Sequence, residues 1–241
     1  MATNYSPKIV TDGLVLSLDA GDKNSFISGS ATWSDLIDAG VNGTLSGSDG
    51  PTVDSNGHIR FNENTSGNAA TINSNYMDIS LSSQISMYNI SFWHKPDALY
   101  QDAYPGYYPT LFLFSSTTAN ISGGPWTGGA ANETFHLWGP GGEMTYIKDD
   151  ISADWHYFTW NWNGSIYDFY LDGEQKTTYN GTNGDGQGVN SILSVTSFRL
   201  ANNKSTYSAR GYFDIIHIYN SQQTLTNITQ NFNAHRHRFG V

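Results

Sequence analysis

Aromatic side chains gather in segments rich in glycine and proline, where a ring is easily exposed. Residues 102–109 read Asp-Ala-Tyr-Pro-Gly-Tyr-Tyr-Pro, and Trp126 and Trp138 lie beside glycine-rich turns. The apolar face of a pyranose ring stacks on such rings, while Asn, Asp and backbone groups bind its hydroxyls. The alternative is that these rings pin long loops onto the protein or pack against a neighbouring subunit. The candidate sugar-binding residues are Tyr104, Tyr107, Tyr108, Trp126 and Trp138.

Acidic residues form a second candidate site. Asp19, Asp22 and Asn24 lie in one loop after a strand-like segment, and Ca²⁺ accepts carboxylates together with backbone carbonyls. Asp214 alternates with Ile216 and so points toward the core, where an isolated charge is too costly. The sequence therefore offers a Ca²⁺ site at Asp19, Asp22 and Asp214. Hydrogen bonding of Asp214 to loop amides is the alternative.

Hydrolytic chemistry has little support in the sequence. A retaining glucanase needs two carboxylates about 5 Å apart, and no Glu-x-Asp-x-x-Glu or similar arrangement occurs. The chain has no Cys and no Gly-x-Ser-x-Gly elbow. Its seven His residues form no zinc pattern. The sequence therefore predicts a protein that is not an enzyme.

The chain ends on a basic segment although it is acidic as a whole. Residues 234–241 carry Arg236, Arg238 and Phe239, whereas Lys+Arg 11 against Asp+Glu 21 gives a net charge of −10. Such a tail either folds back on the acidic surface or docks on a partner, and these three residues are the candidates for docking. The negative charge repels phosphate backbones, and no apolar run is long enough to span a membrane. We expect neither nucleic-acid binding nor membrane insertion.

Short stretches of alternating apolar and polar residues must position these groups, and they predict strands. The clearest hairpin joins 155–162 to 166–171 through Asn163-Gly164, a dipeptide that adopts the positive φ values of a tight turn. The residues of this hairpin expected to face the core are Phe158, Trp160, Phe169 and Leu171. Further strands are expected at 14–18, 90–95, 110–114, 135–138, 144–147, 197–200 and 212–219. Surface loops are expected at 46–58, 62–75, 97–109, 117–132 and 180–190.

The fold class follows from this pattern and from a composition in which charged residues make up only 13%. We predict one all-β domain over residues 1–241, an antiparallel β-sandwich or jellyroll. One short C-terminal helix is expected at 226–233. A short arm over about 1–8 and the basic tail over about 234–241 flank the domain.

Six sequence elements occur in an order that resembles a known family. They are 14–21, 33–36 with 42–45, 90–96, 154–157, 169–174 and 213–220. The series is similar to the laminin-G-like jellyroll of the concanavalin A-like lectin and glucanase superfamily, over nearly the whole chain. Related jellyrolls bind Ca²⁺ at a sheet rim, and the resemblance carries this property to Asp19 and Asp214.

The opening at 7–16 and the ending at 230–241 look like structural proteins of tailed phages. In that family the fold serves on virion surfaces as capsid decoration, fibre or adhesin parts. The resemblance implies a virion surface protein, made in the host cytoplasm without a signal peptide. Its expected partners are other virion proteins, further copies of itself and host surface glycans. A free-standing carbohydrate-binding lectin is the main alternative, followed by a glycan-processing enzyme.

Overall fold

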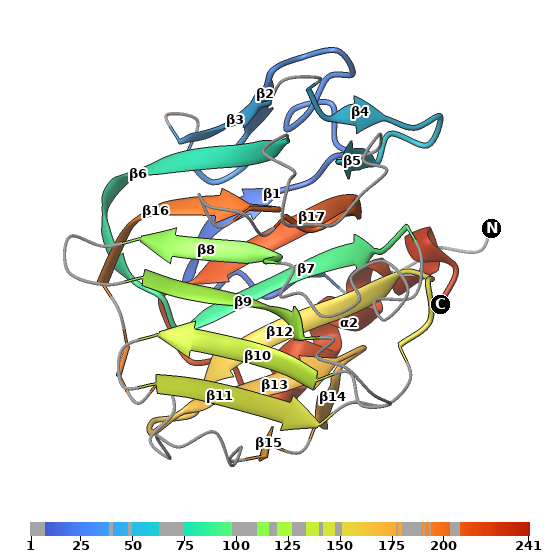
Figure 1. Ribbon diagram of the computed structural model, residues 1–241. Coiled ribbons are helices and arrows are strands. Elements are labelled where there is room, and N and C mark those ends of the chain that lie inside the picture. The colour runs from blue at the N-terminus through green and yellow to red at the C-terminus, as the bar shows by residue number, and fades with distance from the viewer. Residues whose placement is uncertain are drawn as a thin grey trace.

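Two antiparallel sheets lie face to face, and one helix packs against the outer side of one of them (Figure 1). The computed structural model describes residues 8–38, 41–47, 50–62, 75–97, 110–115, 120–126, 134–139, 142–147, 151–176, 178–179, 189, 191–192, 194–202 and 208–241. The predicted all-β sandwich with one C-terminal helix is confirmed. Within these residues no helix is long and apolar enough to cross a membrane.

Sheet A has the strand order β14-β13-β12-β7-β17-β5-β4, with β1 paired to β17. Its strands are β1 (Leu14–Leu18), β4 (Thr52–Val53), β5 (Ile59–Phe61), β7 (Asn89–Lys95), β12 (His156–Trp162), β13 (Tyr167–Leu171), β14 (Glu174–Lys176) and β17 (Gly211–Tyr219). The predicted hairpin is β12–β13, in which Phe158 pairs with Leu171 and Trp160 with Phe169. All four side chains face the core, as expected.

Sheet B has the order β15-β11-β10-β9-β8-β16-β6-β3-β2. Its strands are β2 (Thr32–Ser34), β3 (Asn42–Ser46), β6 (Tyr76–Ser86), β8 (Phe112–Ser115), β9 (Asn120–Trp126), β10 (Thr134–Gly139), β11 (Gly142–Ile147), β15 (Thr178–Tyr179) and β16 (Ser194–Leu200). The prediction of a loop at 117–132 is wrong for β9, which pairs with β8 and β10. Gly123 of β9 serves packing, because a Cβ on this residue would lie 2.5 Å from the Phe112 ring.

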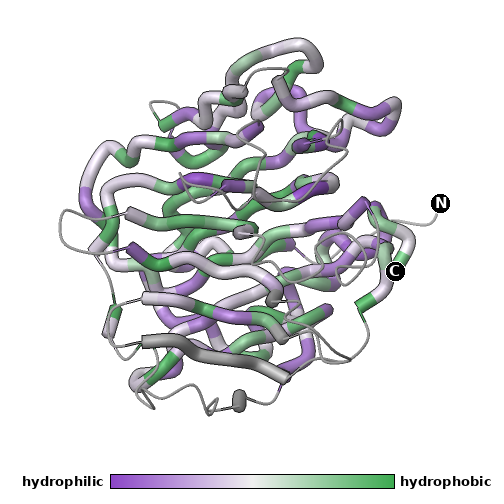
Figure 2. The backbone as a smooth tube through the Cα atoms, in the orientation of Figure 1, coloured by the Kyte–Doolittle hydropathy of each residue, from purple (hydrophilic) through white to green (hydrophobic). Residues whose placement is uncertain are grey.

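The core between the sheets is rich in aromatic rings. Phe92 stacks on Phe158 with 5.7 Å between ring centroids, and Trp160 meets the edge of Phe112 at 5.0 Å. Hydrophobic residues recur along the strands of both sheets (Figure 2). Because the rings come from both sheets, burying them holds the two layers together.

Helix α2 (Leu225–Phe239) covers the side of sheet A that faces away from sheet B. The Thr224 side chain accepts the Asn227 N–H at its start, and Gly240, at φ 76°, ends it by donating its N–H to the Arg236 carbonyl. The helix therefore runs six residues beyond the predicted end at 233, and the predicted tail forms its last turns. Apolar spacing fades in the His-Arg-His-Arg stretch, so periodicity alone ended the helix too early.

A second aromatic cluster forms beneath this helix. Its buried members are Trp93, Trp155, Tyr157, Ile215 and Phe239. Phe239 stacks on Trp93 at 4.1 Å between centroids, and Phe232 stacks on the same indole at 5.7 Å. The last turns of the helix are thus fixed to the sheet by ring contacts.

Candidate functional site

Two of the predicted Ca²⁺ ligands, Asp19 and Asp214, lie on either side of an arginine from helix α2. Arg238 donates from Nη2 to Asp214 Oδ1 at 2.7 Å and from Nη1 to Asp19 Oδ1. The Nδ1 of His58 contacts the other carboxylate oxygen of Asp214. Asp214 is fully buried, and burial raises its pKa while His58 and Arg238 lower it. The partners of this buried carboxylate are therefore side chains, where the sequence offered a metal ion or loop amides.

The third predicted ligand, Asp22, lies outside this cluster. Its Oδ1 accepts the Asn24 N–H at 2.8 Å and the Asn24 side-chain amide at 3.0 Å, which closes a turn. Across the residues that the structure describes, no three metal-ligating side chains converge. The Ca²⁺ site stays a prediction, and Arg238 already compensates two of its three carboxylates.

Two of the predicted partner-docking residues are used inside the protein. Phe239 is buried in the aromatic cluster, and Arg238 holds Asp19 and Asp214. For these two residues the structure shows the fold-back alternative. Only Arg236 is exposed, with its guanidinium 5.9 Å from the Phe232 ring centroid. Docking through Arg236 stays a prediction.

Of the predicted sugar-binding residues, the structure places one side chain. Tyr104, Tyr107 and Tyr108 lie outside the described residues, as does the Trp126 side chain. Trp138 is half-buried on β10 and stacks on His136 at 5.0 Å with 12° between the ring planes. Burial lowers the pKa of His136 to about 3, so the ring beside the indole is neutral.

A Ser-His-Asp chain lies at the start of β12, which sequence reasoning missed. The Ser152 hydroxyl is 3.2 Å from His156 Nε2, and His156 Nδ1 is 2.7 Å from Asp172 Oδ2. A nucleophilic serine must pass its proton to the histidine. Here the Ser152 hydroxyl donates to Asp154 at 2.9 Å, while Asp172 also accepts the Tyr157 N–H at 2.8 Å. The chain ties the ends of β12 and β13 together, and Asp154 is a second acceptor for the Ser152 hydroxyl.

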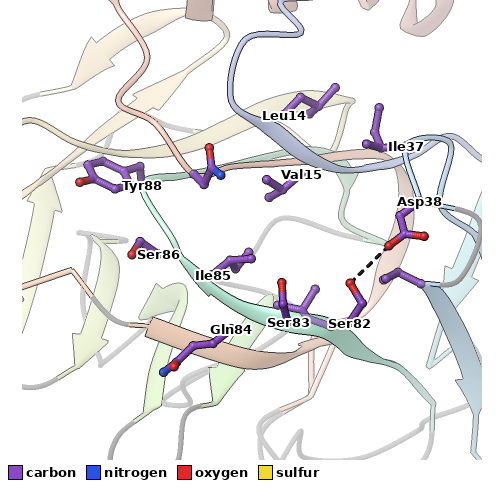
Figure 3. A pocket seen from close by; sticks show the side chains of 13 residues that line it. Leu14, Val15, Ile37, Asp38, Ser82, Ser83, Gln84, Ile85, Ser86 and Tyr88 are labelled. Carbon is purple, nitrogen blue, oxygen red and sulfur yellow. Dashed lines mark hydrogen bonds between the residues drawn. The ribbon is translucent and has the colours of Figure 1, made fainter.

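A groove of about 580 Å³ lies between β1 and the second half of β6, and we call it the edge groove (Figure 3). Its lining residues are Leu14, Val15, Ile37, Asp38, Val41, Leu81, Ser82, Ser83, Gln84, Ile85, Ser86, Tyr88 and Asn220. A volume of this size fits a small-molecule ligand.

The edge groove follows from a mismatch between β6 and β16. Ser197 pairs with Ser80 and Val195 pairs with Ile85, so residues 81–84 stand opposite Thr196 alone. Extra residues on one strand bend it out of the ladder. The bulged stretch carries the exposed Ser82, Ser83 and Gln84 into the wall of the groove.

A buried carboxylate fixes the opposite wall. Asp35 Oδ1 accepts the N–H groups of Ser17 at 2.8 Å and Ile37 at 3.1 Å, and its Oδ2 accepts that of Asp38 at 3.0 Å. Burial raises the pKa of Asp35, and these three N–H groups oppose that rise. Asp35 thereby joins the loop that carries Ile37 and Asp38 to strand β1.

The edge groove combines an apolar floor with polar ends. Val15 and Ile85 lie between Tyr88 at one end and Asp38 at the other (Figure 3). The Ser82 hydroxyl donates to the Asp38 carboxylate at 3.3 Å. Apolar surface with a few oriented polar groups is the usual composition of a ligand site. No local sequence motif predicts the groove, because the groove depends on how β6 and β16 pair.

Neither a family model nor a curated protein matches this chain. Solved structures do match it. Domain 4 of AbnA, a GH43 extracellular arabinanase from Geobacillus stearothermophilus, in complex with arabinotriose, is 19% identical with a TM-score of 0.58, covering 90% of this chain and 97% of that one.

Two larger proteins contain a similar fold. The binding domain of botulinum neurotoxin DC in complex with SialylT is 13% identical with a TM-score of 0.61, and 93% of this chain covers 52% of it. Trypanosoma rangeli sialidase in complex with sialic acid is 11% identical with a TM-score of 0.59, and 95% of this chain covers 34% of it. At these identities the likeness shows the fold alone. The chain shares an antiparallel β-sandwich fold with these proteins, which is the fold class that the sequence resemblance implied.

Proposed function

We propose that this protein is a non-enzymatic glycan-binding module and that the edge groove holds the saccharide. The observation that carries the proposal is the composition of the groove, in which Tyr88, Asp38 and Asn220 surround an apolar floor. Three proteins of similar fold, in complex with arabinotriose, SialylT and sialic acid, support it by analogy.

The groove offers the contacts that a sugar ring needs. A ring face can lie on Tyr88 and the aliphatic floor, while hydroxyls bond to the amide of Asn220 and to the serines of β6. Backbone hydrogen bonds hold these groups in place, because the Tyr88 N–H donates to the Tyr219 carbonyl at 3.0 Å and the Asn220 N–H donates to the Gly13 carbonyl at 2.8 Å. The three N–H groups bonded to Asp35, which we call the Asp35 clamp, hold Asp38 in a similar way. Groups held before binding limit the entropy lost on binding.

Binding without hydrolysis follows from the carboxylates present. Asp38 is the single carboxylate that lines the groove, whereas glycoside hydrolysis uses a pair. At the Ser152 chain, Asp154 competes with His156 for the serine hydroxyl. In our proposal the protein retains its glycan unchanged.

The finer part of the proposal concerns where the module is displayed. The sequence resemblance supports a place on the surface of a tailed-phage virion, as a capsid decoration, tail or fibre component that assembles with itself and with other virion proteins. Mass spectrometry of purified particles tests this part by counting copies of the chain against the major capsid protein. Hundreds of copies support decoration and a few dozen support a tail or fibre. Absence from particles contradicts the display proposal and leaves the free-standing lectin.

Glycan binding itself is tested with the purified chain on a glycan array, followed by calorimetry on the saccharides retained. We expect Tyr88→Ala to abolish retention and Trp138→Ala to leave it unchanged. If Trp138→Ala abolished glycan binding and Tyr88→Ala left it unchanged, the binding site would lie on the outer side of sheet B. An array without any retained glycan would contradict the proposal. Leu225→Ala, on the exposed start of helix α2, is the control.

A further inference from the structure

We infer that the edge groove selects neutral saccharides that carry an N-acetyl group and rejects anionic ones. This inference rests on the proposed function and names the ligand class of the same site. Three features of the groove carry it: the charge of its lining, the aliphatic character of its floor, and the pairing of a carboxylate with an exposed isoleucine at one end.

The charge of the groove comes from one side chain. Asp38 is the single charged residue of the lining, and none of the other lining residues is Lys, Arg or His. The chain as a whole carries −10. A sugar carboxylate entering the groove would meet a like charge and no compensating cation, which is the arrangement by which sites reject a wrong ligand.

The floor of the groove is aliphatic where many sugar sites are aromatic. Val15, Leu81 and Ile85 form it, and Tyr88 is the one aromatic ring of the lining. One ring provides a single stacking surface for a pyranose face. The remaining apolar area suits methyl groups, which saccharides carry on acetamido and deoxy positions.

The end of the groove opposite Tyr88 decides which methyl-bearing group fits. Ile37 has 51% of its surface exposed and adjoins Asp38 in the chain, and both line the groove (Figure 3). An acetamido group presents an N–H donor next to a methyl group. The N–H can donate to the Asp38 carboxylate while the methyl packs against Ile37. A hydrogen bond to an ionised acceptor is stronger than a neutral one.

The geometry of Asp38 is set before a ligand arrives. Its backbone N–H is held by Asp35, and its carboxylate accepts the Ser82 hydroxyl from the facing wall. An ionised carboxylate accepts from several donors at once, so a ligand N–H can bond to Asp38 alongside the donors that the protein supplies. The oxygen atoms of Asp38 thereby face across the groove, where a bound acetamido group would lie.

The test is calorimetry on the full chain with three trisaccharides of equal length: N-acetylglucosamine, glucose and galacturonate. We expect the N-acetylated trimer to bind, the glucose trimer to bind about tenfold more weakly, and galacturonate to give no heat. Asp38→Asn should weaken binding of the N-acetylated trimer about tenfold. It should also reduce the difference in affinity between this trimer and the galacturonate trimer. Glu174→Gln removes the same charge from an exposed position on β14, outside the groove, and should match the native protein.

The outcomes separate this inference from the proposed function. Equal binding of the glucose or galacturonate trimer, lost with Tyr88→Ala, would overturn the selectivity and keep the glycan site. Binding that Asp38→Asn and Glu174→Gln weaken equally would overturn the role of Asp38. If no trimer binds and the array retains no glycan, both proposals fail, and an extended peptide becomes the ligand class to examine.

Discussion

Two regions of the molecule place a carboxylate beside apolar side chains: the side of sheet A under helix α2, and the edge groove. The first region excludes water from its carboxylate, whereas the second leaves its carboxylate exposed to water. Under the helix, Asp214 is fully buried against His58 and Arg238, and aromatic rings cover the neighbouring surface. In the groove, Asp38 is exposed and accepts a hydroxyl from Ser82. A buried carboxylate whose partners exclude water stabilises the fold, whereas an exposed carboxylate in an open groove can be reached by a ligand in addition to its protein partners.

The comparison makes a general prediction about substitutions. Changes under the helix should lower the free energy of unfolding and leave the groove's affinity intact in the protein that remains folded. Changes in the groove should do the reverse.

Acid should destabilise the fold through buried histidines on both sides of sheet A, with His94 on the core side and His217 under helix α2. Burial lowers the pKa of His94 and of His217, which lies beneath helix α2 beside His235, from the ordinary 6.5 to about 3. The unfolded chain therefore binds protons that the folded chain excludes, and stability is lost as pH falls from 6.5 toward 3. Each histidine removes about 1.4 kcal/mol per pH unit in that window, or about 2.7 together.

Melting temperatures from pH 7.5 to 4 measure this loss. Against a total stability of about 5–15 kcal/mol, we expect unfolding before the window ends. His217→Leu should remove about half of the slope that these two histidines cause. A melting temperature that stays constant down to pH 4 would contradict the buried neutral state of both rings.

Removing the ring at the end of the helix should have the next largest effect. Phe239→Ala deletes a ring stacked on Trp93, and we expect a loss of about 3–5 kcal/mol in denaturant unfolding. Leu225→Ala, at the exposed start of the same helix, should change stability by about 0.5 kcal/mol or less. If both variants lost a similar amount of unfolding free energy, the last turns of helix α2 would not contribute to the stability of sheet A.

Gly21 tests the ion-pair cluster. A Cβ at this position would lie 2.2 Å from the Arg238 guanidinium, which cannot move aside without leaving Asp19 and Asp214. We expect Gly21→Ala to cost about 1–3 kcal/mol. In an Arg238→Met background the same substitution should cost much less, so a double-mutant cycle measures the coupling. Additive losses would show that the clash is relieved elsewhere.

A chelator should have the smallest effect. Because Arg238 pairs with both Asp19 and Asp214, we expect the melting temperature to be the same in buffer with and without excess chelator. A clear decrease would restore the Ca²⁺ prediction for Asp19, Asp22 and Asp214, and would require Arg238 to leave the cluster when metal is present.

The elements that could be predicted are those whose signal is local. The β12–β13 hairpin contains an Asn-Gly turn between two alternating strands, and both its register and its core residues were predictable. Strand β9 was not predictable, because its glycines and proline interrupt the alternation of apolar and polar residues. Its pairing with β8 and β10 defines it as a strand. The start of helix α2 is predictable from apolar spacing, but its end is not. Its last turns depend on the Phe239 contacts and the Gly240 cap.

The candidate site could be predicted from the sequence less well than the fold. The edge groove exists because four residues of β6 face one residue of β16, a property of two strands that neither segment reveals alone. The pairing of Arg238 with Asp19 joins residues 219 positions apart. The burial of Asp214 was predictable, but alternation placed it on the core face with Ile216, and this face is wrong. The irregular pairing of β17 between Phe213 and Ile216 turns Asp214 toward helix α2, where Arg238 is its partner.

The Asp35 clamp has a consequence for the kinetics of recognition. Because three N–H groups hold the loop of Ile37 and Asp38 before any ligand arrives, the groove needs no rearrangement during the encounter. Association should then proceed in a single step whose rate rises in proportion to ligand concentration, without the plateau that a slow conformational change produces. Differences in affinity among saccharides would therefore lie in how quickly each one leaves.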